Sequence, residues 1–357
     1  MANNSNQTLF DICALNSSSR YEAYSSYSVL LMGIVALPII CFGWLANSVS
    51  VGIFSHRVMR ATPINWYLTV LSISDFFILL SSFFMLTLPR AGEVTEIYGA
   101  IRLSYLVAPF MYAVGIVAQT ISVYMTVLMS AHRFIGVCFP FKAGGILSRS
   151  RVKVAVTVVL IAGAVVNLTR FFEVRVIGDC WAFNINYSMP VLGPTSLRTN
   201  DTYIMLFTGW FYTIFMFIVP FIALITMNSM VILAVRRTRR LHGAIGDDLS
   251  KKQELAKEIS TSVMLVSIVV VFLTCNSLSF IVNIMENILD PDDPHSQLKV
   301  IYLKLVEVSN LTITINASIN IFVYCLFSEK YRLLLRHFFL CQWCKEGEYL
   351  MNSIQQP

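Results

Sequence analysis

Seven apolar segments, each long enough to cross a membrane, divide this sequence. An α-helix rises about 1.5 Å per residue, so roughly 20 apolar residues span a hydrocarbon core of about 30 Å. Because lipid offers the backbone no hydrogen-bonding partner, uninterrupted runs of this kind form helices. We therefore predict an all-α membrane protein, a seven-transmembrane helix bundle, with spans at residues 29–54, 64–88, 104–131, 152–169, 204–234, 259–285 and 300–326.

Composition agrees with this fold class. Of the 357 residues, 56% are hydrophobic and only 13% are charged, which is too apolar for one soluble domain of this length. After the seventh span, the run "FSEKYRLLLRHFF" mixes apolar and charged residues. We predict that residues 328–340 form a short amphipathic eighth helix on the bilayer surface. Residues 341–357 then form a cytoplasmic tail.

The basic residues predict the orientation of the chain, because lysine and arginine accumulate in cytoplasmic loops. With the N-terminus outside, seventeen of the 26 basic residues lie on the cytoplasmic side and eight on the outer side. Residues 1–27 then form an extracellular tail, in which the sequons at Asn3, Asn6 and Asn16 are candidates for glycosylation. We expect a multi-pass protein of the plasma membrane whose N-terminus is extracellular.

An acidic residue, Asp75, falls near the middle of the second predicted span. A charge at this depth is unfavourable by several kcal/mol unless it is paired or solvated. Polar residues occur at matching depth in other spans, and one carboxylate among such groups can hold a small cation such as sodium. The alternative is a purely structural hydrogen-bond hub. The candidate switch and metal site consists of Asp75, Asn47, Ser122, Asn316 and Asn320.

Several motifs resemble those of rhodopsin-like G-protein-coupled receptors over residues 28–340. They are "GWLANS", "LSISD", Arg133 followed by "GVCFPF", "FIVPFIALITMN" with Pro220, and "NASINIFVY" with Tyr324. The resemblance implies a heterotrimeric G protein as the cytoplasmic partner. It also implies coupling roles for Arg133, for the apolar Phe141 on the following loop and for Tyr324.

A narrower set of pieces is similar to invertebrate receptors for FMRFamide-like neuropeptides. These are "AQTISVYMTV", "NLTRFFE", "NIMENI" and "SNLTITINASIN". Peptides of that class end in Arg-Phe-amide, so twelve acidic residues outside against seven inside would attract them. We expect Glu173, Glu286 and Glu307, at the outer ends of spans four, six and seven, to contact the ligand. The alternative for each is a solvated helix end.

The chain departs from the receptor pattern at residues that change conformation when such receptors are activated. The acid that precedes the arginine in the family is His132 here, which cannot hold Arg133 by an ionic bond at neutral pH. Asn276 and Leu278 replace the tryptophan and proline of the sixth span, and Ile321 replaces the proline of the seventh. We interpret the chain as a divergent receptor and expect activity without ligand.

The cysteines depart from the family as well. The resemblance implies a bond from the outer loop cysteine, Cys180, to the third span, but Ala108 occupies that position. Cys13 is the other cysteine on the outer side, and a Cys13 to Cys180 bond depends on a geometry that the sequence leaves open. Cys341 and Cys344 follow the amphipathic run and are candidates for palmitoylation.

Other functions stay open at this point. One is an orphan or chemosensory receptor for a non-peptide ligand, and another is a transporter, although no internal repeat is visible. Gly115 stands in the third span where amine receptors need an acid, and Lys304 lies too near the outer end of its span for an opsin.

We expect a peptide ligand, a G protein and the lipid bilayer as partners, and no nucleic acid. We expect no enzymatic reaction and no cofactor beyond an allosteric sodium ion.

Overall fold

The computed structural model describes residues 24–182, 184–242, 249–288 and 297–340, most of which are helical. Seven helices in this part are long and apolar enough to cross a membrane, which confirms the predicted seven-helix bundle. They cover Ser26–Ser55, Ile64–Val94, Tyr98–Cys138, Arg149–Phe172, Asp201–Arg237, Ile259–Glu286 and Leu298–Phe327.

The spans combine α-helix with π-helical and 3-10 segments. The first span consists of α2 (Ser26–Ser28), η1 (Val29–Val35) and α3 (Ala36–Ser55). The second consists of α5 (Ile64–Ser82), η2 (Phe83–Thr87) and α6 (Leu88–Val94), and the third is α7 (Tyr98–Cys138). The fourth span contains α9 (Arg149–Val166) and η3 (Leu168–Phe172). The fifth contains α10 (Asp201–Tyr203), η4 (Ile204–Phe211), η5 (Thr213–Ile218) and α11 (Val219–His242). The sixth lies in α12 (Leu249–Ile288) and the seventh in α13 (Gln297–Phe327).

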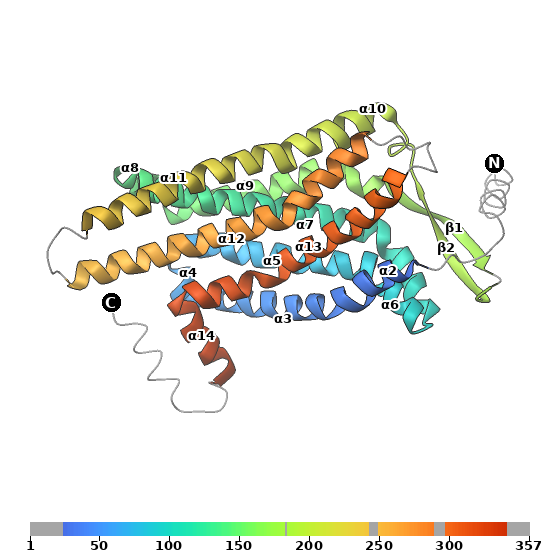
Figure 1. Cartoon of the computed structure of the whole chain (residues 1–357), viewed down its shortest axis with the longest axis horizontal. Helices are drawn as coiled ribbons and strands as arrows, with labels where there is room; N and C mark the ends of the chain where they lie inside the picture. Colours follow the sequence, from blue (N-terminus) through green and yellow to red (C-terminus); the bar gives the residue numbers. More distant parts are fainter. Residues whose placement is uncertain (1–23, 183, 243–248, 289–296, 341–357) are drawn as a thin grey trace.

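Three short helices lie at one end of the bundle, which we name the cytoplasmic end after the predicted orientation: α4 (Arg57–Arg60), α8 (Pro140–Ile146) and α14 (Glu329–Leu340). Helix α14 leaves the bundle at an angle to the spans (Figure 1). Its Tyr331 and Leu334 are buried against the bundle while Phe338 is exposed. The Tyr331 hydroxyl lies 2.8 Å from the Ser50 hydroxyl of α3. This helix matches the predicted amphipathic eighth helix.

A β-hairpin that the sequence analysis did not predict lies at the opposite end (Figure 1). Strands β1 (Val174–Ala182) and β2 (Tyr187–Pro194) pair antiparallel, with an irregularity between Val176 and Gly178. Arg102 of α7 donates to the Ser188 carbonyl at 2.7 Å and to Asp179 at 2.8 Å. These bonds attach the hairpin to the third span at this end of the bundle, which we name the outer end after the predicted orientation.

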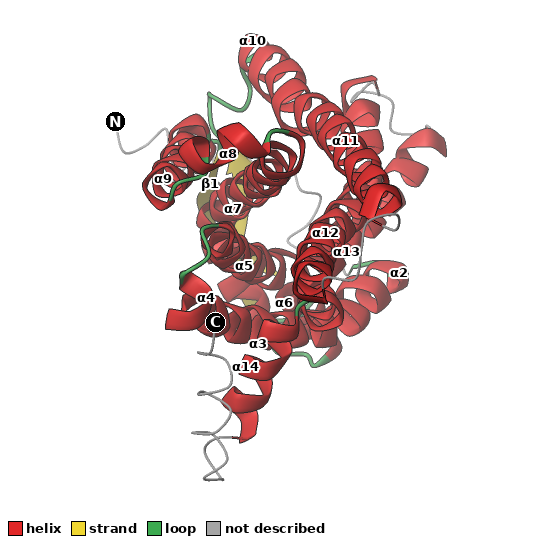
Figure 2. Cartoon of the chain, turned by 90° about the vertical axis from the view of Figure 1, so that its left-hand side faces the viewer, coloured by secondary structure: helices red, strands yellow, loops and turns green. Residues whose placement is uncertain are grey.

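Hydrogen bonds between spans add to the apolar packing of the bundle. Figure 2 shows the bundle from one end. Lipid tails are as apolar as leucine, so helix association in a membrane comes from close packing and interhelical hydrogen bonds. The hydroxyls of Ser279 in α12 and Ser309 in α13 lie 2.7 Å apart in the buried interior. Asn47 of α3 donates to the Ala317 carbonyl of α13 at 2.8 Å. Such bonds fix the rotation of each helix toward its neighbour.

Candidate functional site

A buried ion cluster forms around Glu173 at the outer end of the fourth span. Its carboxylate lies 2.8 Å from Arg170 and 3.5 Å from Arg198. The hydroxyls of Tyr112 and Tyr203 donate to it at 3.0 Å and 2.6 Å. With its side chain 0% exposed, Glu173 already has its charge balanced and its oxygens occupied. The geometry thus favours a structural role, and contact with a ligand stays a prediction.

The carboxylate of Glu307 in α13 has a weaker internal partner. One of its oxygens lies 3.5 Å from Arg90, and the side chain is 19% exposed. Arg90 is engaged elsewhere, because it donates to the Ser28 hydroxyl and, at 2.8 Å, to the Leu86 carbonyl. The second carboxylate oxygen, Oε2, is buried and has no hydrogen-bond partner in the described part of the chain. It is an unused acceptor at the outer end of the bundle.

Tyr24, just before the first span, covers Arg90, the partner of Glu307. Its ring stacks on the Arg90 guanidinium at 4.5 Å, and its hydroxyl lies 3.1 Å from that of Tyr105 in α7. The Tyr24 backbone N–H donates to Glu93 at 3.0 Å. Burial, followed by the nearby Tyr105, raises the pKa of the Tyr24 hydroxyl above its ordinary value. A neutral phenol therefore covers Arg90, which attaches the start of the first span to spans two and three.

Glu286 lies at the outer end of α12 and is exposed. Its carboxylate lies near Tyr212 of the fifth span and Tyr302 of the seventh. Arg198 also lies near Tyr302. Glu286 therefore lies near the ends of the fifth and seventh spans, and contact with a ligand stays a prediction for it.

The second cluster lies in the middle of the bundle, around Asp75 of α5. This side chain is completely buried. Ser122 of α7 donates to one of its oxygens at 2.9 Å and Asn320 of α13 donates to the other at 2.8 Å. The structure thus brings three of the five predicted switch residues into direct contact and couples spans two, three and seven.

The two remaining switch residues contribute differently. Asn47 bonds to the Gly43 and Ala317 carbonyls, so it joins spans one and seven. Asn316 lies one turn before Asn320 and is buried. No cluster of three or more His, Cys, Asp or Glu side chains occurs in the described residues. The donor set at Asp75, one carboxylate and a hydroxyl, suits a weakly held monovalent cation better than a transition metal.

At the cytoplasmic end, Arg133 lies five residues before the end of α7 and is half-buried. The preceding His132 packs edge-on against Tyr67 of α5, with ring centres 5.7 Å apart. Asn228 of α11 donates to Ser130 at 3.0 Å, which joins the fifth span to the third beside the arginine. Phe141 on α8 is fully exposed. An apolar side chain in this position is available to a partner protein.

Tyr324 lies deeper than the other two predicted coupling residues. It is 1% exposed, and its ring packs against Phe54 of α3 at 5.0 Å and Tyr331 of α14 at 5.4 Å. Burial raises the pKa of the Tyr331 hydroxyl, so this tyrosine is neutral and can hydrogen-bond to Ser50. In this conformation Tyr324 is a packing residue between the seventh span and helix α14.

Cys180 on strand β1 is disulfide-bonded, whereas Cys41, Cys138, Cys275 and Cys325 are free. Its partner therefore lies outside the described residues. So do several other predicted sites, on which the structure gives no information: Cys13, Cys341, Cys344, Asn3, Asn6 and Asn16.

Sequence reasoning missed the arginines that balance the outer carboxylates. Arg170 stands three residues before Glu173 in "RFFE". This spacing brings two side chains together on a helix, so this ion pair could have been predicted from the sequence. Nothing local links Arg90 to Glu307, which are 217 residues apart in the chain.

Comparison with known proteins is consistent with this architecture. The model of the rhodopsin family of seven-transmembrane receptors matches residues 46–324. The FMRFamide receptor of Drosophila melanogaster is 31% identical over 307 residues, which cover 83% of this chain and 52% of that receptor. The FMRFamide peptide receptor frpr-18 of Caenorhabditis elegans is 28% identical over 312 residues, 85% of this chain and 68% of that receptor. This chain is therefore a multi-pass membrane protein that belongs to the rhodopsin family of seven-transmembrane receptors.

Proposed function

We propose that this chain is a plasma-membrane receptor, with an extracellular N-terminus, for an amidated FMRFamide-like neuropeptide. Binding outside activates a heterotrimeric G protein inside, and no covalent reaction is involved. The observation that carries the proposal is the buried Oε2 of Glu307, which has no hydrogen-bond partner among the described residues. The resemblance to two receptors named for FMRFamide supports the ligand class.

The chemistry of the ligand fits this acceptor. The guanidinium of an Arg-Phe-amide end carries five N–H donors and pairs strongly with a carboxylate. Arg90 pairs only weakly with Glu307, because its nearest atom is 3.5 Å away and its other donors point to Ser28 and Leu86. Glu286 adds a second, exposed carboxylate on the neighbouring span, which attracts the cation before it is bound.

Glu173 supports ligand binding indirectly. Its cluster joins the fourth span to Tyr112 in α7 and Tyr203 in α10. Tyr203 and Asn200 lie where the chain enters the fifth span, and the Asn200 side chain caps α10 through the Tyr203 N–H. The cluster therefore fixes the outer ends of spans three, four and five, against which the peptide is held.

The cytoplasmic side supplies the coupling surface. Arg133 and the exposed Phe141 lie on consecutive helices, α7 and α8, at the end opposite the β-hairpin (Figure 1). A charged group beside an apolar one suits the C-terminal helix of a G protein. Asp75 and its partners connect this side to the outer side through spans two, three and seven, and sodium bound there would favour the resting state by mass action.

The experiment is a peptide screen in transfected cells, with calcium and cAMP as readouts. Each peptide ending in Arg-Phe-amide is tested beside its free acid and beside a version in which citrulline replaces the arginine. We expect nanomolar to micromolar responses to the amidated arginine peptides alone, and none in mock-transfected cells. A receptor at the cell surface that answers to none of them, or equally well to citrulline, contradicts the proposal.

A further inference from the structure

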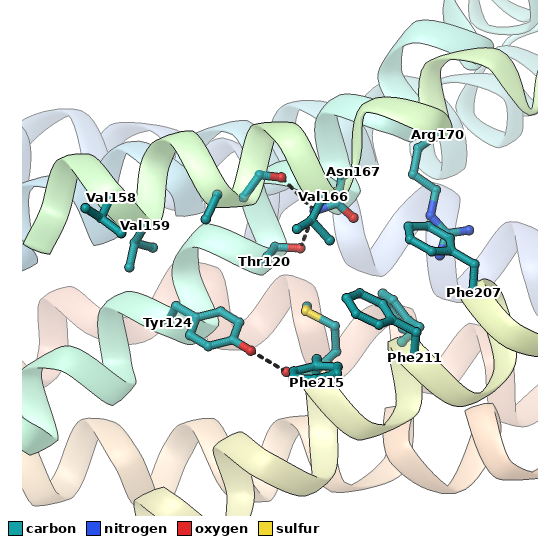
Figure 3. Close-up of a pocket in the computed structure, with 14 residues that line it drawn as sticks. Thr120, Tyr124, Val158, Val159, Val166, Asn167, Arg170, Phe207, Phe211 and Phe215 are labelled. Carbon is teal, nitrogen blue, oxygen red and sulfur yellow. Dashed lines mark hydrogen bonds between the residues drawn. The ribbon is translucent and has the colours of Figure 1, made fainter.

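A cavity of about 360 Å³ lies between the fourth and fifth spans, with the third span behind it (Figure 3). One wall comes from α9, where Val158 and Val166 flank the small residues Ala162 and Gly163. The opposite wall comes from η4 and η5. The Val158 side chain is 58% exposed, so the cavity opens toward the surface that faces lipid.

The wall on the fifth span is a ladder of aromatic rings. Phe207 and Phe211 stack with centres 5.3 Å apart, and the Phe215 ring is tilted against Phe211 with centres 4.6 Å apart. Each ring stands four residues from the next, so successive rings lie on the same face of the helix. The ladder and the small residues of α9 together form a rigid, apolar groove.

Polar groups at the back of the groove are already satisfied. The Tyr124 hydroxyl donates to the Phe215 carbonyl at 2.8 Å. The Asn167 amide donates to Thr120 at 3.0 Å and to the Gly163 carbonyl at 2.8 Å. These groups do not require water, and an apolar occupant meets no unpaired donor from them.

The outer end of the groove differs, because it holds Arg170. This residue is 2% exposed and its Nε has no hydrogen-bond partner among the described residues. Its guanidinium lies 5.3 Å from the Phe207 ring and 5.4 Å from the Tyr212 ring, both of which line the cavity. Figure 3 shows the side chain extending from α9 toward Phe207. A buried N–H donor thus lies at the outer end of an apolar groove.

We propose that this groove binds a membrane sterol. The fused rings lie between the Ala162–Gly163 side and the phenylalanine ladder, and the sterol hydroxyl accepts a hydrogen bond from Arg170 Nε. This inference does not depend on which peptide the receptor recognises.

Charge favours a neutral head group over a phosphate. Glu173 lies 2.8 Å from Arg170 and balances its charge, so a phosphate in the same place would be repelled by that carboxylate. A hydroxyl needs only one donor, and Arg170 Nε has no partner among the described residues. Arg170 also lies near the outer end of its span, where the hydroxyl of a sterol in the outer leaflet is found.

Rigidity favours a sterol over an acyl chain. A flexible chain loses rotational freedom when it is held in a fixed groove, whereas fused rings have little to lose. From Val158 to Val166 the groove follows eight residues of α-helix, about 12 Å, and Arg170 lies one turn beyond. This length accommodates a rigid ring system with its polar end at the arginine.

The test is photolabelling of the purified receptor in lipid nanodiscs, using a diazirine sterol with a free hydroxyl. We expect labelled peptides from α9 and η4. Ala162→Phe fills the groove and should reduce labelling about tenfold, whereas Ala164→Phe makes the same change at an exposed residue of α9 outside the groove and should leave labelling unchanged. Thermal stability of both variants in detergent checks that they are folded.

A competition experiment tests the hydrogen bond. Cholesterol should displace the probe about tenfold better than the same sterol without its hydroxyl, because one hydrogen bond to a charged donor is lost. Equal labelling of the Ala162 and Ala164 variants would overturn the proposed site. A phospholipid probe that depends on Ala162 to the same extent would instead identify an acyl-chain groove, and equal competition by both sterols would exclude the role of Arg170.

Discussion

Arg170 and Glu173 form an ion pair of 2.8 Å at the outer end of the fourth span, with side chains only 2% and 0% exposed. Arg102 and Asp179, which attach the β-hairpin to the third span, are also 2.8 Å apart, but their side chains are 29% and 44% exposed. The two pairs have the same separation in different surroundings. The first has lost its hydration and depends on its partners, while the second is screened by water.

Removing one member of the buried pair should therefore destabilise the receptor far more than removing one member of the exposed pair. We expect Glu173→Gln to lower the free energy of unfolding by about 3 to 5 kcal/mol, since Arg170 is left buried and uncompensated. Asp179→Asn should lower it by about 1 kcal/mol or less. Thermal unfolding of the purified variants measures both. Similar losses would mean that burial does not distinguish the pairs.

The two other outer carboxylates should affect ligand potency instead. Glu307→Gln and Glu286→Gln should each weaken an Arg-Phe-amide agonist about tenfold or more, because a charge-assisted hydrogen bond is worth about 1.5 to 3 kcal/mol. The citrulline peptide should be insensitive to both changes. Glu96→Gln alters an exposed acid near the end of the second span and serves as the control. Unchanged potency in both variants at normal surface expression would remove the assignment.

Sodium should lower agonist affinity through Asp75. Its carboxylate links Ser122 and Asn320, and a bound ion would stabilise that arrangement. We expect agonist affinity in membranes to be at least about fivefold lower in sodium than in N-methylglucamine at the same ionic strength. Asp75→Asn should abolish the difference. If it persists in this variant, the ion binds elsewhere.

The residue before Arg133 should set the activity of the ligand-free receptor. His132 packs against Tyr67 and provides no carboxylate, so His132→Asp should add an ionic restraint of about 0.5 to 1 kcal/mol and reduce basal signalling about two- to fivefold. Peptide affinity should not change. G-protein activation without ligand, at matched surface expression, is the measurement. A silent wild type, or a higher basal signal in the variant, would show that the missing acid does not set the resting state.

Phe141 should be needed for coupling but not for ligand binding. It is fully exposed on α8, so Phe141→Ala should leave the fold and peptide affinity intact. G-protein activation should fall about tenfold, as expected when an apolar anchor of an interface is removed. Radioligand binding and nucleotide exchange on the same membranes separate the two properties. Equal loss of both would indicate misfolding instead.

The disulfide of Cys180 should lead to the N-terminal tail. The four other cysteines of the described residues are free, and of the remaining three only Cys13 is predicted to lie outside. Non-reducing peptide mapping should recover Cys13 linked to Cys180, and Cys13→Ser should expose one reactive thiol at Cys180. Cys41→Ser, in the first span, is the control and should leave the linked peptide intact.

The sequence determined the membrane fold. A membrane interior forces the backbone to satisfy its own hydrogen bonds, so an apolar run of sufficient length is a helix whatever surrounds it. The predicted span 64–88 became Ile64–Val94 and 300–326 became Leu298–Phe327. The third helix extends further, to Tyr98–Cys138, because helices continue into water, where apolarity no longer marks them.

Only the tertiary structure decided what surrounds each carboxylate. Glu173 and Glu307 look alike in the sequence, yet the first is surrounded by two arginines and two tyrosines, while Oε2 of the second has no partner among the described residues. Some of their partners, such as Arg90, come from other helices. They lie so far away along the chain that the spacing of residues in the sequence does not predict the contact. The groove beside Arg170 has the same origin, because it exists only where small residues of one helix face a ring ladder of another. Local chemistry fixes helices in lipid, but the charge and space at a site depend on which helix faces become neighbours.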